Sequence, residues 1–245
     1  MSTAQGFGEF RFTPPSSGFF KGLTFPARPV EFSAIDGDAV FEGDIILGKV
    51  HEVEGIEEGL AIKGAGFRWP GAVVVYRIAA GLPNAQRVSD AIAHWEANTS
   101  IRFRLRTDED DFVTFRAGSG CNSQVGMQGG EQFVTLGSAC SAGNAIHEIG
   151  HTVGLWHEQS RADRNQHVTI VFDNIMPDAA SNFDQQITDG DDIGEYDFDS
   201  IMHYPADAFA IDPSQPTIIT AHGEAIGQRV GLSAGDIAAV ATIYP

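Results

Sequence analysis

The eleven residues HEIGHTVGLWH, at positions 147–157, constrain this chain more than any other stretch. Residues four apart share one face of an α-helix, so His147 and His151 can bind one metal ion together. If the helix continued, His157 would lie on its far side, about 240° round from His151. Gly154 permits the left-handed backbone that ends a helix and turns the chain back, which would bring His157 to the same ion. The spacing therefore predicts a helix, a glycine turn and a three-histidine metal site.

Three imidazoles with one position left open are typical of catalytic rather than structural zinc. Glu148 lies about 100° round the same helical turn, where its carboxylate can hold a water beside the metal. The pattern HExxH alone occurs by chance in unrelated helices. The longer pattern fixes a third histidine and a glycine as well, so a chance match is far less frequent.

Composition bounds the classes of protein and partner. The 245 residues are 42% hydrophobic, which suits one folded domain of ordinary size, or one domain with an appended segment. The formal net charge of −18 repels nucleic acid phosphates and anionic lipid, so neither is an expected partner. No apolar run is long enough to span a membrane, and the first residues do not resemble a secretory signal.

The patterning predicts an α+β fold. β-Branched or alternating stretches predict strands at 71–78, 101–106, 111–118, 133–137 and 167–172. Helical spacing of Val88, Ile92 and Trp95 predicts a helix over 84–99, and a second helix over 141–154 carries the metal-binding histidines. Residues 51–59 are acidic and predict an exposed linker, and the chain after 172 has few periodic elements. The order strand, helix, strands, helix indicates α+β.

Several further stretches agree, in order, with one known family. HEIGHTVGLWHEQSRADR resembles the astacin pattern HExxHxxGFxHExxRxDR, with Leu155 where phenylalanine is usual. YDFDSIMHY resembles the family's methionine turn, and GQRVGLSAGD its motif near the end. From about residue 66 the chain resembles the astacin zinc metallopeptidases, which are metzincins. This implies an N-terminal subdomain with a twisted mixed sheet and two long helices, followed by a largely irregular C-terminal subdomain.

The resemblance also implies roles for individual residues. His147, His151 and His157 would bind one catalytic Zn²⁺, and protein or peptide substrates would be cleaved there. Glu148 would be the general base. Tyr204 would be an additional ligand that swings off the metal and stabilises the oxyanion. Met202 would form the apolar floor beneath the histidines.

Two more positions take their roles from the resemblance. Glu158 would accept the new N-terminal ammonium after activation, and the alternative is a surface glutamate. Arg229 would line the pocket for the residue after the scissile bond and would favour Asp or Glu there. The alternative for Arg229 is a structural salt bridge.

Cys121 and Cys140 are the two cysteines of the chain. Their spacing alone leaves open two free thiols or a disulfide, and the resemblance implies the disulfide. A second bridge usual in the family is missing, because Ser100 stands at one cysteine position and the chain ends in TIYP. Loss of a native disulfide costs roughly 2–5 kcal/mol, which other interactions must offset.

A separate stretch, FEGDIILG at 41–48, reads on its own as a turn between apolar residues. Astacin precursors carry an FxGD motif in a pro-segment, and Phe41, Gly43 and Asp44 match it. The resemblance implies that Asp44 binds the zinc in place of the catalytic water. Residues 1–65 would then be a pro-segment that covers the active-site cleft, and 66–245 the peptidase domain. An activating protease would cut near 58–68, where Lys63 is a tryptic site.

The sequence therefore predicts a latent, monomeric zinc endopeptidase. We expect it to be secreted or extracytoplasmic, although no signal peptide is visible in this chain. One alternative is a metzincin-like hydrolase with a narrower substrate. The other is a non-catalytic zinc-binding scaffold protein. The intact Glu148 and Tyr204 argue against the scaffold, which needs neither a base nor an oxyanion partner.

Overall fold

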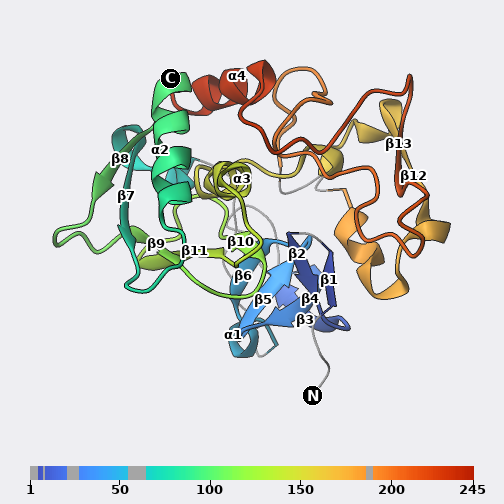
Figure 1. The fold of residues 1–245 in the computed structure, drawn as a ribbon, viewed down its shortest axis with the longest axis horizontal. Helices are drawn as coiled ribbons and strands as arrows, with labels where there is room; N and C mark the ends of the chain where they lie inside the picture. Colours follow the sequence, from blue (N-terminus) through green and yellow to red (C-terminus); the bar gives the residue numbers. More distant parts are fainter. Residues whose placement is uncertain (1–4, 8, 21–27, 55–64, 186–189) are drawn as a thin grey trace.

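The computed structural model describes residues 5–7, 9–20, 28–54, 65–185 and 190–245 (Figure 1). Its main element is a nine-stranded mixed sheet with the strand order β3-β4-β5-β6-β10-β11-β9-β7-β8. Two-stranded sheets pair β1 with β2 and β12 with β13. The α+β class is confirmed.

Five strands of the large sheet belong to the part that follows residue 66. They are β7 (Val73–Ile78), β8 (Arg102–Leu105), β9 (Phe112–Arg116), β10 (Cys121–Ser123) and β11 (Glu131–Leu136). β7 runs parallel to β8 and β9, β9 runs parallel to β11, and β10 runs antiparallel to β11. The predicted strands are confirmed within a few residues. β10 was not predicted, because three residues in a glycine-rich loop show no alternation.

Two helices pack together against this sheet: α2 (Gln86–Asn98) and α3 (Ala142–Thr152). α2 buries Val88, Ile92 and Trp95, as the helical spacing predicts. α3 begins at Ser141, whose hydroxyl accepts from the Asn144 N–H while the Asn144 side chain accepts from the Ser141 N–H. This reciprocal capping box fixes where the histidine-bearing helix starts.

The N-terminal part adds four antiparallel strands to the edge of the sheet. These are β3 (Ser16–Phe20), β4 (Arg28–Ile35), β5 (Asp38–Phe41) and β6 (Ile45–Lys49), preceded by the hairpin of β1 (Gln5–Phe7) and β2 (Phe10–Phe12). β6 joins β10 in parallel, where Ile45 pairs with Ser123. A short helix, α1 (Val50–Glu54), follows where the sequence predicted the start of an exposed linker. Its Val53 is buried against Val30 and Phe32, which explains the difference. The remainder of that linker, residues 55–59, lies outside the described residues.

The C-terminal part is largely irregular, as predicted. Its described residues contain four short 3₁₀ helices, β12 (Val168–Ile170), β13 (Ile218–Thr220) and a final helix, α4 (Ala234–Ile243); the 3₁₀ helices span Glu158–Ser160, Arg164–Gln166, Phe172–Asn174 and Pro177–Phe183. Two more 3₁₀ turns, Ala65–Phe67 and Pro70–Ala72, precede β7. α4 was not predicted, because its mostly small apolar residues give weak helical periodicity. No helix in the part of the chain that the structure describes is long and apolar enough to cross a membrane.

Cys121 and Cys140 form a disulfide with an S–S distance of 2.10 Å, which ties β10 to the loop before α3. At the position of the missing second bridge, the Ser100 hydroxyl donates to the Tyr244 carbonyl at 3.4 Å. The Tyr244 hydroxyl donates to the Val153 carbonyl at 3.0 Å and accepts from the Trp69 N–H at 3.2 Å. Hydrogen bonds therefore hold the chain end where the family uses a disulfide.

Candidate active site

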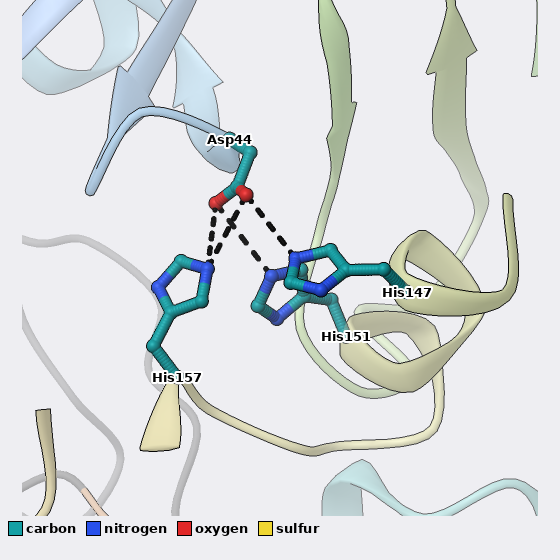
Figure 2. A group of neighbouring side chains, drawn as sticks. All are labelled: Asp44, His147, His151 and His157. Carbon is teal, nitrogen blue, oxygen red and sulfur yellow. Dashed lines mark hydrogen bonds and ion pairs between the residues drawn. The ribbon is translucent and has the colours of Figure 1, made fainter. Parts of the chain in front are cut away.

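Four ionisable side chains converge at one buried point: Asp44, His147, His151 and His157 (Figure 2). Each is at most 1% exposed, and one ligand atom from each lies within 4.8 Å of the others. The Asp44 carboxylate lies 3.2 Å from Nε2 of His147, 3.6 Å from that of His151 and 3.0 Å from that of His157. The structure therefore brings together all four predicted metal-facing residues.

The glycine turn delivers the third histidine. α3 ends at Thr152, and Gly154 follows with φ of 109°. The Gly154 N–H donates to the His151 carbonyl at 2.8 Å, and the Leu155 N–H reaches back to the Gly150 carbonyl at 2.9 Å. These bonds close the helix end and turn the chain, as a positive-φ glycine allows. His157 then lies in extended backbone with its ring facing the first two histidines.

The far side of each imidazole is hydrogen-bonded to an oxygen. Nδ1 of His147 lies 2.7 Å from the Ile201 carbonyl, and Nδ1 of His151 lies 2.8 Å from the Leu155 carbonyl. Nδ1 of His157 lies 2.8 Å from the Glu42 carboxylate. Because these partners are acceptors, each Nδ1 carries a proton, and each ring, when neutral, turns an unprotonated Nε2 to the centre.

The centre therefore holds three nitrogen lone pairs and a carboxylate, all of them acceptors. Such a set is stable when a cation lies between its members. In the described part of the chain, Asp44 Oδ1 and His151 Nε2 are buried without a hydrogen-bond partner, as expected for metal-ligand atoms. Three histidines and a carboxylate are a usual tetrahedral donor set for Zn²⁺. The cluster fits one zinc ion.

The pKa directions of His147, His151 and Asp44 favour the unprotonated forms that bind a metal, whereas a metal at His157 would displace a proton. Burial and the charge of Arg229 lower the pKa of His147 to about 3, and burial also lowers the pKa of His151. Burial would raise the pKa of Asp44, but the three histidines outweigh it and hold that pKa well below its usual value. Burial opposes protonation of His157, yet the charges of Asp44 and Glu42 raise its pKa to about 9.

Glu42 is a site residue that the sequence analysis missed. It is fully buried, and its carboxylate accepts from His157 Nδ1 and, at 3.1 Å, from the Ser160 hydroxyl. Its backbone has φ of 46°, and its carbonyl accepts from the Tyr204 hydroxyl. Glu42 occupies the variable position of FxGD, so the motif carries no signal for it.

Glu148 lies beside the metal-facing groups on α3 and is 1% exposed. Burial, and then the charges of Asp44 and Glu9, raise its pKa well above the usual range. Its Oε2 makes no hydrogen bond to the part of the chain that is described. The group is therefore suited to taking up and holding a proton in a dry site.

Tyr204 and Met202 complete the walls of the site. Tyr204 is fully buried, with its ring centroid 4.7 Å from that of His157. Met202 is 2% exposed and packs beneath α3, where a Cβ added to Gly150 would lie 2.4 Å from its sulfur. Gly150 thus lets the methionine lie directly under the helical turn between the two histidines.

Glu158 and Arg229 lie near the centre without facing it. The Glu158 carboxylate accepts from the Asp197 N–H at 2.7 Å, and burial raises its pKa to about 7. A cavity of about 470 Å³ adjoins it, lined also by Trp156, Asp197 and Asp236. The Arg229 guanidinium forms a salt bridge with the Glu9 carboxylate, which was the alternative left open for Arg229, although the sequence did not indicate Glu9 as the partner.

Comparisons with known proteins agree with this geometry. The family model described as "Astacin", a peptidase family, matches residues 61–245. Human tolloid-like protein 2 is 42% identical over 188 residues, which cover 72% of this chain and 18% of that protein. Zinc metalloproteinase nas-36 of Haemonchus contortus is 37% identical over 231 residues, covering 84% of this chain and 38% of the relative. This chain thus spans less than two fifths of the length of either relative.

A solved structure is similar over nearly its whole length. High choriolytic enzyme 1, a hatching enzyme zinc-protease from the medaka Oryzias latipes, superposes with a TM-score of 0.69 at 32% sequence identity. The match covers 75% of this chain and 98% of that structure.

Proposed function

The chain belongs to the astacin family, and from this premise we propose that it is a latent zinc endopeptidase whose own N-terminal segment occupies its active site. The observation that carries the proposal is the Asp44 carboxylate among the three histidines. His147, His151 and His157 would hold the zinc ion. Asp44 would take the fourth position, which a catalytic site leaves open.

Zinc held by three imidazoles supplies Lewis acid chemistry, polarising a carbonyl and lowering the pKa of water. Glu148 would remove a proton from the attacking water and pass it to the leaving amine, and its raised pKa favours holding that proton in between. Tyr204 would donate its hydroxyl to the oxyanion that forms on the substrate. In this chain that hydroxyl donates to the Glu42 carbonyl, so the pro-segment occupies the oxyanion partner as well. Met202 would keep the floor apolar.

The domain boundary follows from the same proposal. Residues 1–65 would form the pro-segment and 66–245 the peptidase domain. The match to nas-36 covers more of this chain than residues 61–245 make up, so it includes residues upstream of 61. A cut near 58–68 would release the segment; Lys63 lies outside the described residues. Glu158, with the cavity beside it, would then accept the new N-terminal ammonium.

Two further features complete the proposal. The disulfide between Cys121 and Cys140 supports a secreted or extracytoplasmic location, because disulfides persist in oxidising compartments. The bond between Arg229 and a glutamate carboxylate supports a preference for substrates with Asp or Glu just after the scissile bond. The substrates would be proteins or peptides, and the active enzyme would be a monomer.

Peptide hydrolysis by the zinc-loaded protein tests the proposal. We expect the intact chain to be silent, and both the chain nicked near Lys63 and Asp44→Ala to cleave in a chelator-sensitive manner. Asp44→Ala should be the slower of the two, because its N-terminal segment keeps its contacts through Glu9 and Glu42. Glu148→Gln, nicked in the same way, is the matched control and should lose at least about a hundredfold in rate. Two substrates that differ only in Asp or Asn after the scissile bond test the pocket, and the aspartate should be preferred about tenfold. If the intact chain were as active as Asp44→Ala, the proposed latent state would be excluded. If every form were inactive, the proposed endopeptidase activity would be excluded.

A further inference from the structure

Glu9 lies between the strands of the N-terminal hairpin and contacts two residues of the distant peptidase part. Its Oε1 accepts from Nη2 of Arg229 at 2.5 Å, and its Oε2 accepts from Nε at 3.2 Å. The side chains of Glu9 and Arg229 are 16% and 13% exposed. This two-point pairing is the geometry in which guanidinium groups recognise carboxylates.

Arg229 is held in place before any carboxylate arrives. Its Nη1 donates to the carbonyls of Ile201 at 2.9 Å, His203 at 3.0 Å and Gln228 at 2.9 Å. These three bonds occupy one nitrogen of the guanidinium. The bonds at Nη1 leave the Nε–Nη2 edge of the Arg229 guanidinium facing Glu9. This edge is therefore held in a fixed orientation that can bind a carboxylate.

Asn144 supplies a third donor, because its Nδ2 also bonds to Glu9 Oε2. The orientation of this amide is fixed by its other end. The Asn144 Oδ1 accepts from the Ser141 N–H at 2.8 Å in the capping box of α3. A backbone N–H can only donate, so the amide must turn Nδ2 toward Glu9. Asn144 is 6% exposed, which makes the donor part of a built site.

The same short segment reaches the catalytic residues. The Glu9 carbonyl accepts from the Cys121 N–H at 3.1 Å, which aligns the segment along β10. The next residue, Phe10, is 1% exposed and packs against Tyr204 with a centroid distance of 5.0 Å. Glu9 and Phe10 therefore lie against β10 and Tyr204, beside the metal-facing histidines.

We infer that Arg229 and Asn144 form a carboxylate-binding site, and that Glu9 is its internal ligand and holds the N-terminal segment in the cleft independently of Asp44. The inference deepens the proposed function and rests on it in one respect: once the segment leaves, the same site receives an acidic side chain of the substrate. Asn144 is thereby a specificity residue together with Arg229. The segment has two anchors, one at the metal and one at this site.

Release of the segment after nicking tests the inference without relying on catalysis. The full zinc-loaded chain, in a Glu148→Gln background, is nicked near Lys63 and diluted, and size-exclusion chromatography follows dissociation of the N-terminal fragment. We expect Glu9→Gln to speed dissociation about ten- to a hundredfold, because a charged hydrogen-bonded pair is lost. Glu31→Gln makes the same change at an exposed position of β4 and should release at the parental rate.

A second pair of variants distinguishes a direct contact between Glu9 and Asn144 from a general weakening of the bound N-terminal segment. Asn144→Asp keeps an acceptor for the capping box but places a negative charge against Glu9, so release should again be about tenfold faster or more. The double variant that combines Asn144→Asp with Glu9→Gln should release the N-terminal fragment no faster than Asn144→Asp alone. The uncharged glutamine removes the repulsion between the two carboxylates. Multiplying effects in the double variant, or a Glu9→Gln rate within about twofold of Glu31→Gln, would overturn the inference. Hydrolysis by nicked chain with an intact Glu148 would still test the proposed function separately.

Discussion

Each metal-facing histidine uses Nδ1 for a different acceptor, and two of these acceptors belong to the peptidase part itself. Ile201 and Leu155 offer backbone carbonyls, which would remain after the proposed cut. His157 depends on the Glu42 carboxylate, which would leave with the N-terminal segment. Partners of this kind set the tautomer and raise the basicity of a ligand histidine. Under the proposed function, the intact chain and its activated form would therefore differ in how strongly His157 is oriented.

Glu42→Ala should weaken zinc binding by the intact chain about ten- to a hundredfold, because His157 loses the acceptor that orients it. Competition with a fluorescent chelator measures the affinity. Glu42→Gln retains an acceptor oxygen for Nδ1 and is the matched control, with a smaller loss expected. Equal affinities of Glu42→Ala and the parent would show that the Ser160 hydroxyl or the backbone orients His157 instead.

At the scale of elements, the sequence predicts helices and strands that have a regular apolar period. It does not predict elements and contacts that depend on residues far away in the chain. The strands at 73–78 and 112–116 and helix α2 follow from apolar periodicity, and the glycine turn after α3 follows from one residue's backbone freedom. β10 and α4 carry little periodicity: β10 is paired between β6 and β11, and α4 begins at a capping box of Ser233 and Asp236. The contact between Glu9 and Arg229 joins residues 220 positions apart, so no local pattern could reveal it. Asp44 and Met202 were predictable only through whole-motif resemblance.

The end of α4 replaces a missing disulfide with hydrogen bonds, and Tyr244 carries most of them. Tyr244→Phe removes a buried hydroxyl and leaves the Val153 carbonyl and the Trp69 N–H without it. We expect a loss of about 1–3 kcal/mol in the free energy of unfolding, measured by urea denaturation with the disulfide intact. Tyr76→Phe is the matched control, since no hydrogen bond of its hydroxyl occurs in the described parts of the chain, and its loss should stay within about 0.5 kcal/mol. Equal losses would mean that packing rather than hydrogen bonding holds the chain end.

Considered as a whole molecule, the N-terminal segment continues the central sheet and is attached through apolar as well as polar contacts. Phe10 packs with Tyr204 and Phe209, and Ile45 packs with Val125. Among the described residues only Ile45 and Ser123 pair between β6 and β10, and the Ser123 N–H also donates to the Asp44 carbonyl at 2.9 Å. The Asp38 carboxylate bonds to Arg116 of β9, and the Asp36 carboxylate accepts from the Ser119 N–H at 2.7 Å; Glu9 adds the Arg229 contact. After the proposed cut, these non-covalent contacts alone would hold the segment, so it could dissociate from the rest of the chain.

Removal of zinc should loosen this segment more than the rest of the molecule, because the ion would be shared by Asp44 and the three histidines. Hydrogen exchange with and without a chelator measures this, and amides of β5 and β6 should exchange roughly tenfold faster or more once the metal is gone. Asp44→Ala provides the control. Its β5 and β6 should already exchange fast and respond little to the chelator, whereas the C-terminal end of α3 should still respond. If chelation left β5 and β6 of the parent chain unchanged while α3 loosened, Asp44 would not be a ligand, and the other contacts of the segment, including that of Glu9, would hold it.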